Sequence, residues 1–148
     1  MMIRKNLILD ACIEKQNELI DGFKNRLKTM ESDAFEHNHT PSQSENQTAG
    51  KIELLNAMGN ELDFALREME FLKTLNADKQ STMVEPGAVV VTEKMTFYIC
   101  VSIEEIEVEG KPFFGISTKA PIYANMRGLV KGDSFSFNET TYIIRNIY

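Results

Sequence analysis

Apolar residues in the first part of the chain recur at alternating intervals of three and four residues. One series contains, in order, Leu9, Ile13, Gln16, Ile20, Phe23, Leu27 and Met30, with glutamine as its one polar member. A second series contains Leu55, Met58, Leu62, Ala65, Met69 and Leu72. This spacing is the a/d pattern of coiled coils. Charged and amide residues fill most positions between, so each series predicts a helix with one narrow apolar stripe.

Two narrow stripes on one chain predict two helices that pair with each other. Because a single connection joins them, antiparallel pairing within the chain is the simplest arrangement, and a parallel dimer is the alternative. We therefore expect an antiparallel coiled-coil hairpin over residues 1–79. Each helix of about 25–30 residues would be roughly 40 Å long at a rise of 1.5 Å per residue. Gly22 and Gly59 weaken these helices by about 1 kcal/mol each relative to alanine.

The segment from Ser32 to Ala49, between the two stripes, is polar and contains Pro41. It is longer than a connection between paired helices requires. We therefore expect a solvated loop at the tip of the hairpin. Ser44 is followed three residues later by Gln47, which partly matches the pattern that begins a helix and makes Ser44 a candidate cap for the second helix.

Beyond Asn76 the chain changes to short runs rich in β-branched and aromatic residues. Residues 77–86 are expected to form a linker that ends in a Pro-Gly turn. Five strands are predicted, over residues 88–92, 96–103, 113–118, 134–137 and 141–147. The segment 121–128 begins with proline and ends with glycine, which predicts one short helix. Residues 84–148 should therefore form a small β-rich domain, and the chain as a whole is predicted to be α+β.

Charge favours a protein partner over a nucleic acid. The 148 residues carry a net charge of −6. Residues 1–79 hold ten basic and fourteen acidic side chains and residues 80–148 hold six and eight, so neither part is basic enough to favour phosphate binding. No apolar run is long enough to span a membrane, and the first residues lack the cleavage site of a secretory signal. A cytoplasmic location is the expectation.

Residues 116–133 contain a longer pattern. In order, Pro121, Ile122, Met126, Gly128, Gly132 and Asp133 match the signature Ser-Pro-(Ile/Leu)-x-x-x-(Leu/Met)-(Ile/Leu)-Gly-x-x-x-Gly-Asp, whereas Ala120 and Arg127 depart from it. This signature is typical of the C-terminal domain of the Gre family of bacterial RNA-polymerase cleavage factors, which the chain therefore resembles. The resemblance implies an FKBP-like fold for the β-rich domain.

A second match lies near the turn of the predicted hairpin. The tripeptide Ser44-Glu45-Asn46 resembles the core of the Asp-x-Ser-Glu-Asn motif at the tip of Gre factors. Family members insert the hairpin into the secondary channel of RNA polymerase, where two tip carboxylates help to hold a catalytic Mg²⁺ for cleavage of backtracked RNA. Glu45 carries over as the catalytic residue. Ser42 stands where the family has aspartate, and Asp33 and Glu36 are candidate substitutes.

The resemblance thus implies a regulator of RNA polymerase that modulates elongation, rather than an enzyme in its own right. It implies a monomer with no cofactor of its own, because the polymerase active site holds the Mg²⁺. The motif residues Pro121, Ile122, Gly128 and Asp133 are assigned to polymerase binding, with a structural role as the alternative. Stimulation of cleavage and occupation of the channel without cleavage both stay open, because a serine hydroxyl is a weaker Mg²⁺ ligand than a carboxylate.

Other polar and sulfur-bearing residues predict no separate site. His37 and His39 are two residues apart and are the chain's two histidines, so we expect no metal site in the isolated protein. Cys12 and Cys100 fall in different predicted parts, so no disulfide framework is expected, and both are expected to fill core positions. The acidic run over residues 104–109 is expected to be a solvated strand edge or turn.

Two further functions stay open. An FKBP-like chaperone or prolyl isomerase would need an aromatic pocket, for which Tyr98, Phe113, Phe114 and Tyr123 are available. A structural coiled-coil protein would instead dimerise through its apolar stripes. A peptide isomerisation assay tests the first function, and a mass measurement tests the second.

Overall fold

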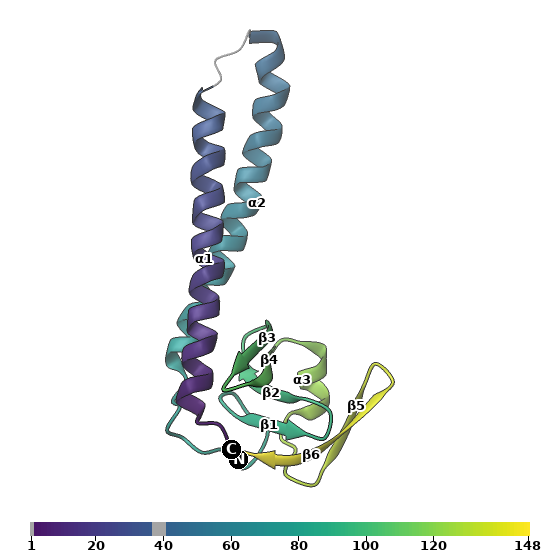
Figure 1. The fold of residues 1–148 in the computed structure, drawn as a ribbon. Helices are drawn as coiled ribbons and strands as arrows, with labels where there is room; N and C mark the ends of the chain where they lie inside the picture. Colours follow the sequence, from purple (N-terminus) through teal and green to yellow (C-terminus); the bar gives the residue numbers. More distant parts are fainter. Residues whose placement is uncertain (1, 37–40) are drawn as a thin grey trace. The chain divides into compact units, whose positions relative to one another are not determined.

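The computed structural model describes the backbone of residues 2–36 and 41–148 and the side chains of residues 2–31 and 50–148. Its elements are α1 (Lys5–Glu36), α2 (Pro41–Thr74), β1 (Val89–Thr92), β2 (Thr96–Cys100), β3 (Ile103–Val108), β4 (Lys111–Ser117), α3 (Pro121–Met126), β5 (Ser134–Phe137) and β6 (Thr140–Ile147). A helical hairpin thus precedes a β-rich part, which confirms the α+β prediction (Figure 1). In the described part of the chain, no helix is both long enough and apolar enough to cross a membrane.

The fold divides into two compact units. One unit combines residues 1–15 with residues 70–148, and the other consists of residues 16–69. The first unit therefore contains the sheet together with the start of α1 and the end of α2. The sequence predicts instead two separate domains, residues 1–79 and residues 84–148. These boundaries stay a prediction.

The unit of residues 16–69 is an antiparallel helix pair whose apolar stripes face each other. Ile20, Ala65 and Met69 are buried, and the remaining stripe residues of this unit are half-buried. Gln16 is 2% exposed, and its Nε2 donates a hydrogen bond of 2.9 Å to the backbone oxygen of Ala65. A buried polar group needs such a partner, so this bond fixes which residues of the two helices lie level with each other.

The predicted loop over residues 32–49 is wrong in its extent. The helix α1 continues to Glu36 and α2 already begins at Pro41. Proline suits the first turn of a helix because its ring fixes φ and its missing N–H would have had no helical partner. Residues 42–49 contain no glycine or proline, so nothing in them stops a helix. Ser44 consequently lies inside α2, and its predicted role as the cap is wrong.

Six strands form one sheet in the order β3-β4-β2-β1-β6-β5. All neighbours are antiparallel except β2 and β4, which run parallel with Phe97 opposite Phe114 and Ile99 opposite Ile116. The predicted count of five strands is wrong, because the acidic run belongs to the edge strand β3. Its apolar residues are buried and its glutamates are exposed, so charge covers an edge that would otherwise be open to another strand.

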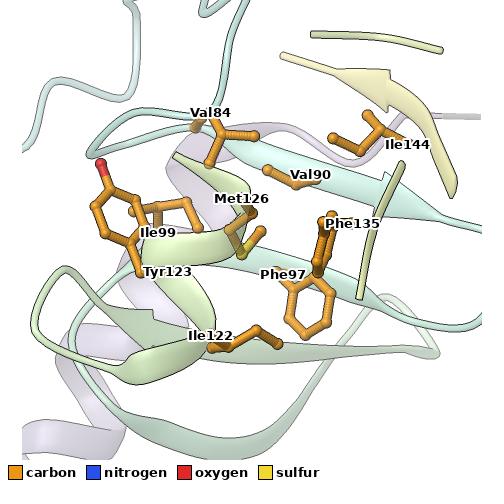
Figure 2. Packing of buried hydrophobic residues seen from close by; sticks show 10 residues of the cluster. Val84, Val90, Phe97, Ile99, Ile122, Tyr123, Met126, Phe135 and Ile144 are labelled. Atoms are coloured by element: carbon orange, nitrogen blue, oxygen red, sulfur yellow. The ribbon is translucent and has the colours of Figure 1, made fainter. Parts of the chain in front are cut away.

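Helix α3 covers one face of the sheet and completes the main core. Ile122, Tyr123 and Met126 project from it onto buried side chains of the strands (Figure 2). The other buried members of this cluster are Val84, Ala88, Val90, Phe97, Ile99, Phe135 and Ile144. The rings of Phe135 and Tyr142 are stacked with their centroids 5.0 Å apart, which ties β5 to β6.

Residues of β2 alternate between the two faces of the sheet, and Tyr98 and Cys100 do not belong to the α3 cluster. The hydroxyl of Tyr98 is buried without a hydrogen-bond partner among the described residues, and burial raises the pKa of this phenol. Cys12 and Cys100 are both buried, which confirms that they fill core positions. A buried hydroxyl without a hydrogen-bond partner, such as that of Tyr98, costs about 1–3 kcal/mol of stability.

Candidate functional site

The sequence places its candidate catalytic residues where the two long helices approach their connection. Asp33 and Glu36 lie on the last turn of α1, and Ser42 and Glu45 lie on the first turns of α2. Their side chains fall outside the described residues, as do both histidines. The structure therefore gives no distance between these carboxylates, and their catalytic roles stay a prediction.

The segment that carries the Gre-like pattern forms α3 and the turn after it. Pro121 is the first residue of α3, and Gly128 has a φ of +77°, a left-handed conformation that favours glycine. The N–H of Gly128 donates a hydrogen bond of 2.9 Å to the backbone oxygen of Val84. The carboxylate of Asp133 accepts one of 2.9 Å from the N–H of Val130. The pattern thus joins α3 and its turn to the segment that leads into β1.

Each motif residue assigned to polymerase binding has a structural task. Ile122 is 9% exposed and packs in the core beside Met126, which is fully buried. Pro121 and Gly128 shape the backbone, and Asp133 holds the turn. The structural alternative therefore accounts for all four residues, and their part in binding a polymerase stays a prediction.

An exposed apolar pair lies beside this turn. Met83 and Val130 are 42% and 46% exposed, and their backbones form an isolated antiparallel bridge. Arg127 and Lys131, on the same turn, are also exposed. Sequence reasoning missed this pair because neither residue belongs to a periodic pattern. Exposed methionine and valine flanked by positive charge form a candidate contact surface of the sheet-containing unit.

The helix pair carries a groove of about 500 Å³ on one side of its seam. Its lining consists of Asn25, Arg26, Thr29 and Met30 from α1 and Leu54, Ala57, Met58 and Glu61 from α2. Leu54 is 52% exposed at this groove. The groove was not predicted from the sequence, since most of its lining lies outside the predicted stripes.

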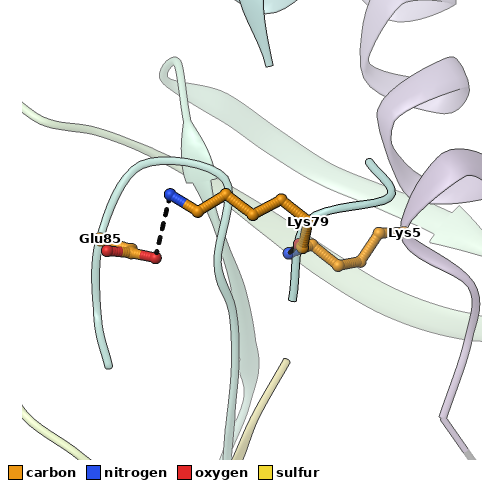
Figure 3. A network of polar contacts seen from close by, with 3 residues as sticks. All are labelled: Lys5, Lys79 and Glu85. Atoms are coloured by element: carbon orange, nitrogen blue, oxygen red, sulfur yellow. Dashed lines mark hydrogen bonds and ion pairs between the residues drawn. The ribbon is translucent and has the colours of Figure 1, made fainter. Parts of the chain in front are cut away.

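A buried lysine anchors the start of α1 to the segment before β1. Lys5 is 6% exposed, and its Nζ donates a hydrogen bond of 2.7 Å to the backbone oxygen of Lys79 (Figure 3). The Nζ of Lys79 in turn lies 3.8 Å from Oε1 of Glu85. Burial lowers the pKa of Lys5, while the charge of Glu85 acts in the opposite direction. The Lys79 side chain is 67% exposed, so its ion pair adds little stability.

We expect the stability of the protein to depend on the charge of Lys5 at alkaline pH. Because the pKa of Lys5 is lower in the folded chain, the unfolded chain binds more protons between that value and 10.5. The free energy of unfolding should therefore rise with pH in this window, relative to the variant Lys5→Met. Urea unfolding of both proteins at pH 8 and near pH 10.5 measures the difference.

The variant Lys5→Arg provides the control for this pH dependence. Its guanidinium stays protonated throughout the window, so the rise should disappear although a positive charge is kept. A stability difference between wild type and Lys5→Met that is flat or falls with pH would contradict the prediction.

The aromatic residues considered for an isomerase pocket are mostly core residues. Tyr98, Phe113 and Tyr123 are between 1% and 8% exposed, and Phe114 is half-buried. Tyr123 packs within the α3 cluster. Side chains that fill the core in this way do not present an open surface to a peptide substrate.

A helical hairpin joined to a six-stranded sheet with one short covering helix defines the class of this protein. No protein-family profile matches the chain, and no curated protein matches it. Two solved structures are similar. One is the transcription factor Gfh1, at 13% identity, with 93% of this chain and 94% of that chain covered and a TM-score of 0.36. The other is GreA factor homolog 1 (Gfh1) of Thermus thermophilus, at 13% identity, with 92% of this chain and 94% of that chain covered and a TM-score of 0.35.

Proposed function

We propose that this chain is a transcription regulator that binds bacterial RNA polymerase and places its helical hairpin in the secondary channel. The observation that carries the proposal is the pattern from Pro121 to Asp133, preceded in the same chain by a long helix pair with Glu45 near its connection. Both the pattern and the order of the parts are those of the Gre family, which the sequence resembles. The sheet-containing unit would then have the FKBP-like fold of that family.

The lengths of the two helices support this role. The helices α1 and α2 contain 32 and 34 residues, which corresponds to about 48–51 Å of straight helix at 1.5 Å per residue. Arms of this length suit a protein that acts at a site within a deep channel. The acidic balance of the chain favours protein over nucleic acid as the surface it grips, and the pair Met83 and Val130 is a candidate for that contact.

The proposed chemistry depends on Glu45. Its carboxylate would add an oxygen ligand to a Mg²⁺ held by the polymerase, and the ion would supply the activation of water for hydrolysis. Ser42 is uncharged at neutral pH, so the chain brings one carboxylate fewer than the family motif. Asp33 and Glu36, at the end of α1, are the side chains that would make up this difference.

Ser42 also favours a second candidate function. A regulator that occupies the channel without promoting cleavage needs the hairpin and the docking unit but not the paired carboxylates. In this form the protein would modulate transcription by blocking access to the active site. It would act in the cytoplasm, where the polymerase works.

The test is transcript cleavage on stalled, backtracked complexes of the cognate RNA polymerase, with co-sedimentation measured on the same mixture. Wild-type protein is expected to co-sediment with the polymerase. If it also promotes cleavage, Glu45→Ala should abolish that activity while co-sedimentation persists. The matched control is Glu53→Ala, an exposed glutamate two turns further along α2, which should retain both properties.

The remaining outcomes separate the two candidates. Binding without cleavage would assign the channel-occupying function, and Ser42→Asp should then introduce cleavage by restoring the second carboxylate. Failure to co-sediment under any condition would refute the proposal and leave a resemblance in sequence pattern alone.

A further inference from the structure

The side chains of Glu93 and Lys94, in the turn between β1 and β2, are bound to the backbone of β6. Oε2 of Glu93 accepts a hydrogen bond of 2.7 Å from the N–H of Ile143. Nζ of Lys94 donates one of 2.6 Å to the backbone oxygen of Thr141 and lies 5.6 Å from the centre of the Tyr142 ring. Two adjacent residues of one turn thus hold three successive residues of a strand.

These contacts lie at an edge of β6 that lacks a strand. On one side β5 pairs with residues 140–143 of β6, whereas on the other side β1 pairs within residues 144–147. Among the strands that the structure describes, none pairs with residues 140–143 on the side of β1. Residues two apart on a strand direct their backbone groups to the same edge, and the bonds of Thr141 and Ile143 to the β1–β2 turn identify it as this free edge.

The turn that carries the two charged residues is fixed by Thr92. Its Oγ1 accepts hydrogen bonds of 3.2 and 3.0 Å from the N–H groups of Lys94 and Met95, and it donates one of 2.6 Å to the backbone oxygen of Met95. Thr92 is 7% exposed, so water competes little for these bonds. The backbone of Glu93 and Lys94 is therefore ordered by the turn itself, which lowers the entropy cost of their contacts with β6.

The two charges supply what a neighbouring strand would supply. A paired strand offers a C=O to an N–H of its neighbour and an N–H to a C=O. Here the carboxylate of Glu93 takes the place of the C=O, and the ammonium of Lys94 takes the place of the N–H. Hydrogen bonds to charged groups are stronger than those between neutral groups. The bond from Ile143 accordingly holds the pKa of Glu93 below its ordinary value.

We propose that Glu93 and Lys94 form a latch that covers the free edge of β6 in place of a strand and opens as one unit. Both residues are exposed, so water competes for their contacts and the closed latch is in equilibrium with an open one. Each contact fixes the distance between the turn and the strand. Loss of one contact therefore lets the strand move away and weakens the other.

Opening of the latch exposes a strand edge. The N–H of Ile143 and the backbone oxygen of Thr141 then lose their partners, beside an Ile143 side chain that is 39% exposed. Such an edge is a template for pairing with an extended chain. The latch is thus a conformational device that keeps this edge closed, and it does not depend on the function proposed above.

The test is hydrogen exchange of single backbone amides, followed by NMR on the full-length chain at neutral pH. In wild-type protein the Ile143 amide should be protected, although it faces a side chain and not a strand. Glu93→Ala removes its acceptor and should raise its exchange rate by roughly tenfold or more. Lys94→Ala leaves the acceptor in place, yet it should also raise this rate, by roughly threefold or more, because the latch opens as one unit.

Two controls separate opening of the latch from a general loss of stability. Lys119→Ala removes an exposed lysine elsewhere in the same unit and should leave the Ile143 rate unchanged. The N–H of Ile99 in β2, which donates a bond of 2.9 Å to the backbone oxygen of Ala88, should stay close to its wild-type rate in every variant. An unprotected Ile143 amide in wild type, or an unchanged rate in Lys94→Ala, would overturn the proposal. Equal acceleration at Ile99 would also overturn it, because the whole sheet would then be opening.

Discussion

Replacing Gly115 with valine is expected to destabilise the sheet by about 3 kcal/mol or more, since the site has no room for a side chain. Gly115 lies in β4 between Tyr98 of β2 and Ile103 of β3. A Cβ atom there would lie 2.6 Å from the backbone oxygen of Val101 and 2.8 Å from the Cβ of Ile103. Val101 lies in the short bend between β2 and β3, and the strands on either side of this bend leave its backbone little freedom to move aside. Urea unfolding followed by circular dichroism should show a much lower midpoint.

Gly59→Ala is the matched control for this substitution. A Cβ at Gly59 has no neighbour within 4 Å, and alanine is the better helix former by about 1 kcal/mol. This variant should therefore be as stable as wild type or slightly more stable. A wild-type midpoint for Gly115→Val would show that the sheet can widen at this point and would contradict the prediction.

Truncating Met126 to alanine is expected to cost about 2–5 kcal/mol of unfolding free energy, because it leaves a cavity in a fully packed site. Met126 is fully buried where α3 meets the sheet. Thermal unfolding should show the loss directly. Met83→Ala removes the same atoms from a residue that is 42% exposed, and it should change stability by less than about 1 kcal/mol. Equal losses for the two variants would be inconsistent with the packing of α3.

The same two variants test whether residues of the Gre-like pattern contact a polymerase or only stabilise the fold. Met126 belongs to the pattern but is buried, whereas Met83 lies outside it and is exposed. At a temperature where Met126→Ala is still folded, co-sedimentation with polymerase should be unchanged. Met83→Ala should weaken it if the exposed pair is the docking surface. The pattern would then mark a fold that presents a contact surface made by other residues.

The hairpin could be predicted because its signal is local and repeated. Each stripe repeats the coiled-coil interval five times or more, and in the structure these residues are buried or half-buried in the seam. The ends of the helices were harder to predict, because residues 32–36 and 42–49 are polar and carry no apolar period. These residues are helical because they include no glycine or proline. The apolar repeat, in contrast, extends only as far as the two helices pack against each other.

The strand β3 was missed for a different reason. Its buried residues Ile103 and Ile106 are three positions apart, since the pairing with β4 shifts register between them. The shift interrupts the alternation that identifies a strand, and the three glutamates of β3 make the segment look like a solvated turn. The parallel pairing of β2 with β4 also has no signature in a single sequence.

The candidate sites differ in how far the sequence could predict them. The pattern from Pro121 to Asp133 predicted a short helix and a turn at these positions, but the structure was needed to show that its residues pack in the core and hold the turn. The groove of the helix pair was not predicted at all, because Leu54 lies beside the apolar stripe and its exposure depends on where the partner helix lies. The tip residues were predicted by resemblance alone.

The order of the strands bears on how the protein is made. Strand β1 lies inside the sheet, yet its neighbour β6 is synthesised after the other five strands of this sheet. About fifty residues separate them, so at about 5–20 residues per second the free edge of Val89-Val90-Val91 stays open for several seconds on the ribosome. A valine-rich edge is a template for pairing with other chains. The yield of soluble protein should therefore depend on chaperones that shield this strand during translation, more than on the stability of the finished sheet.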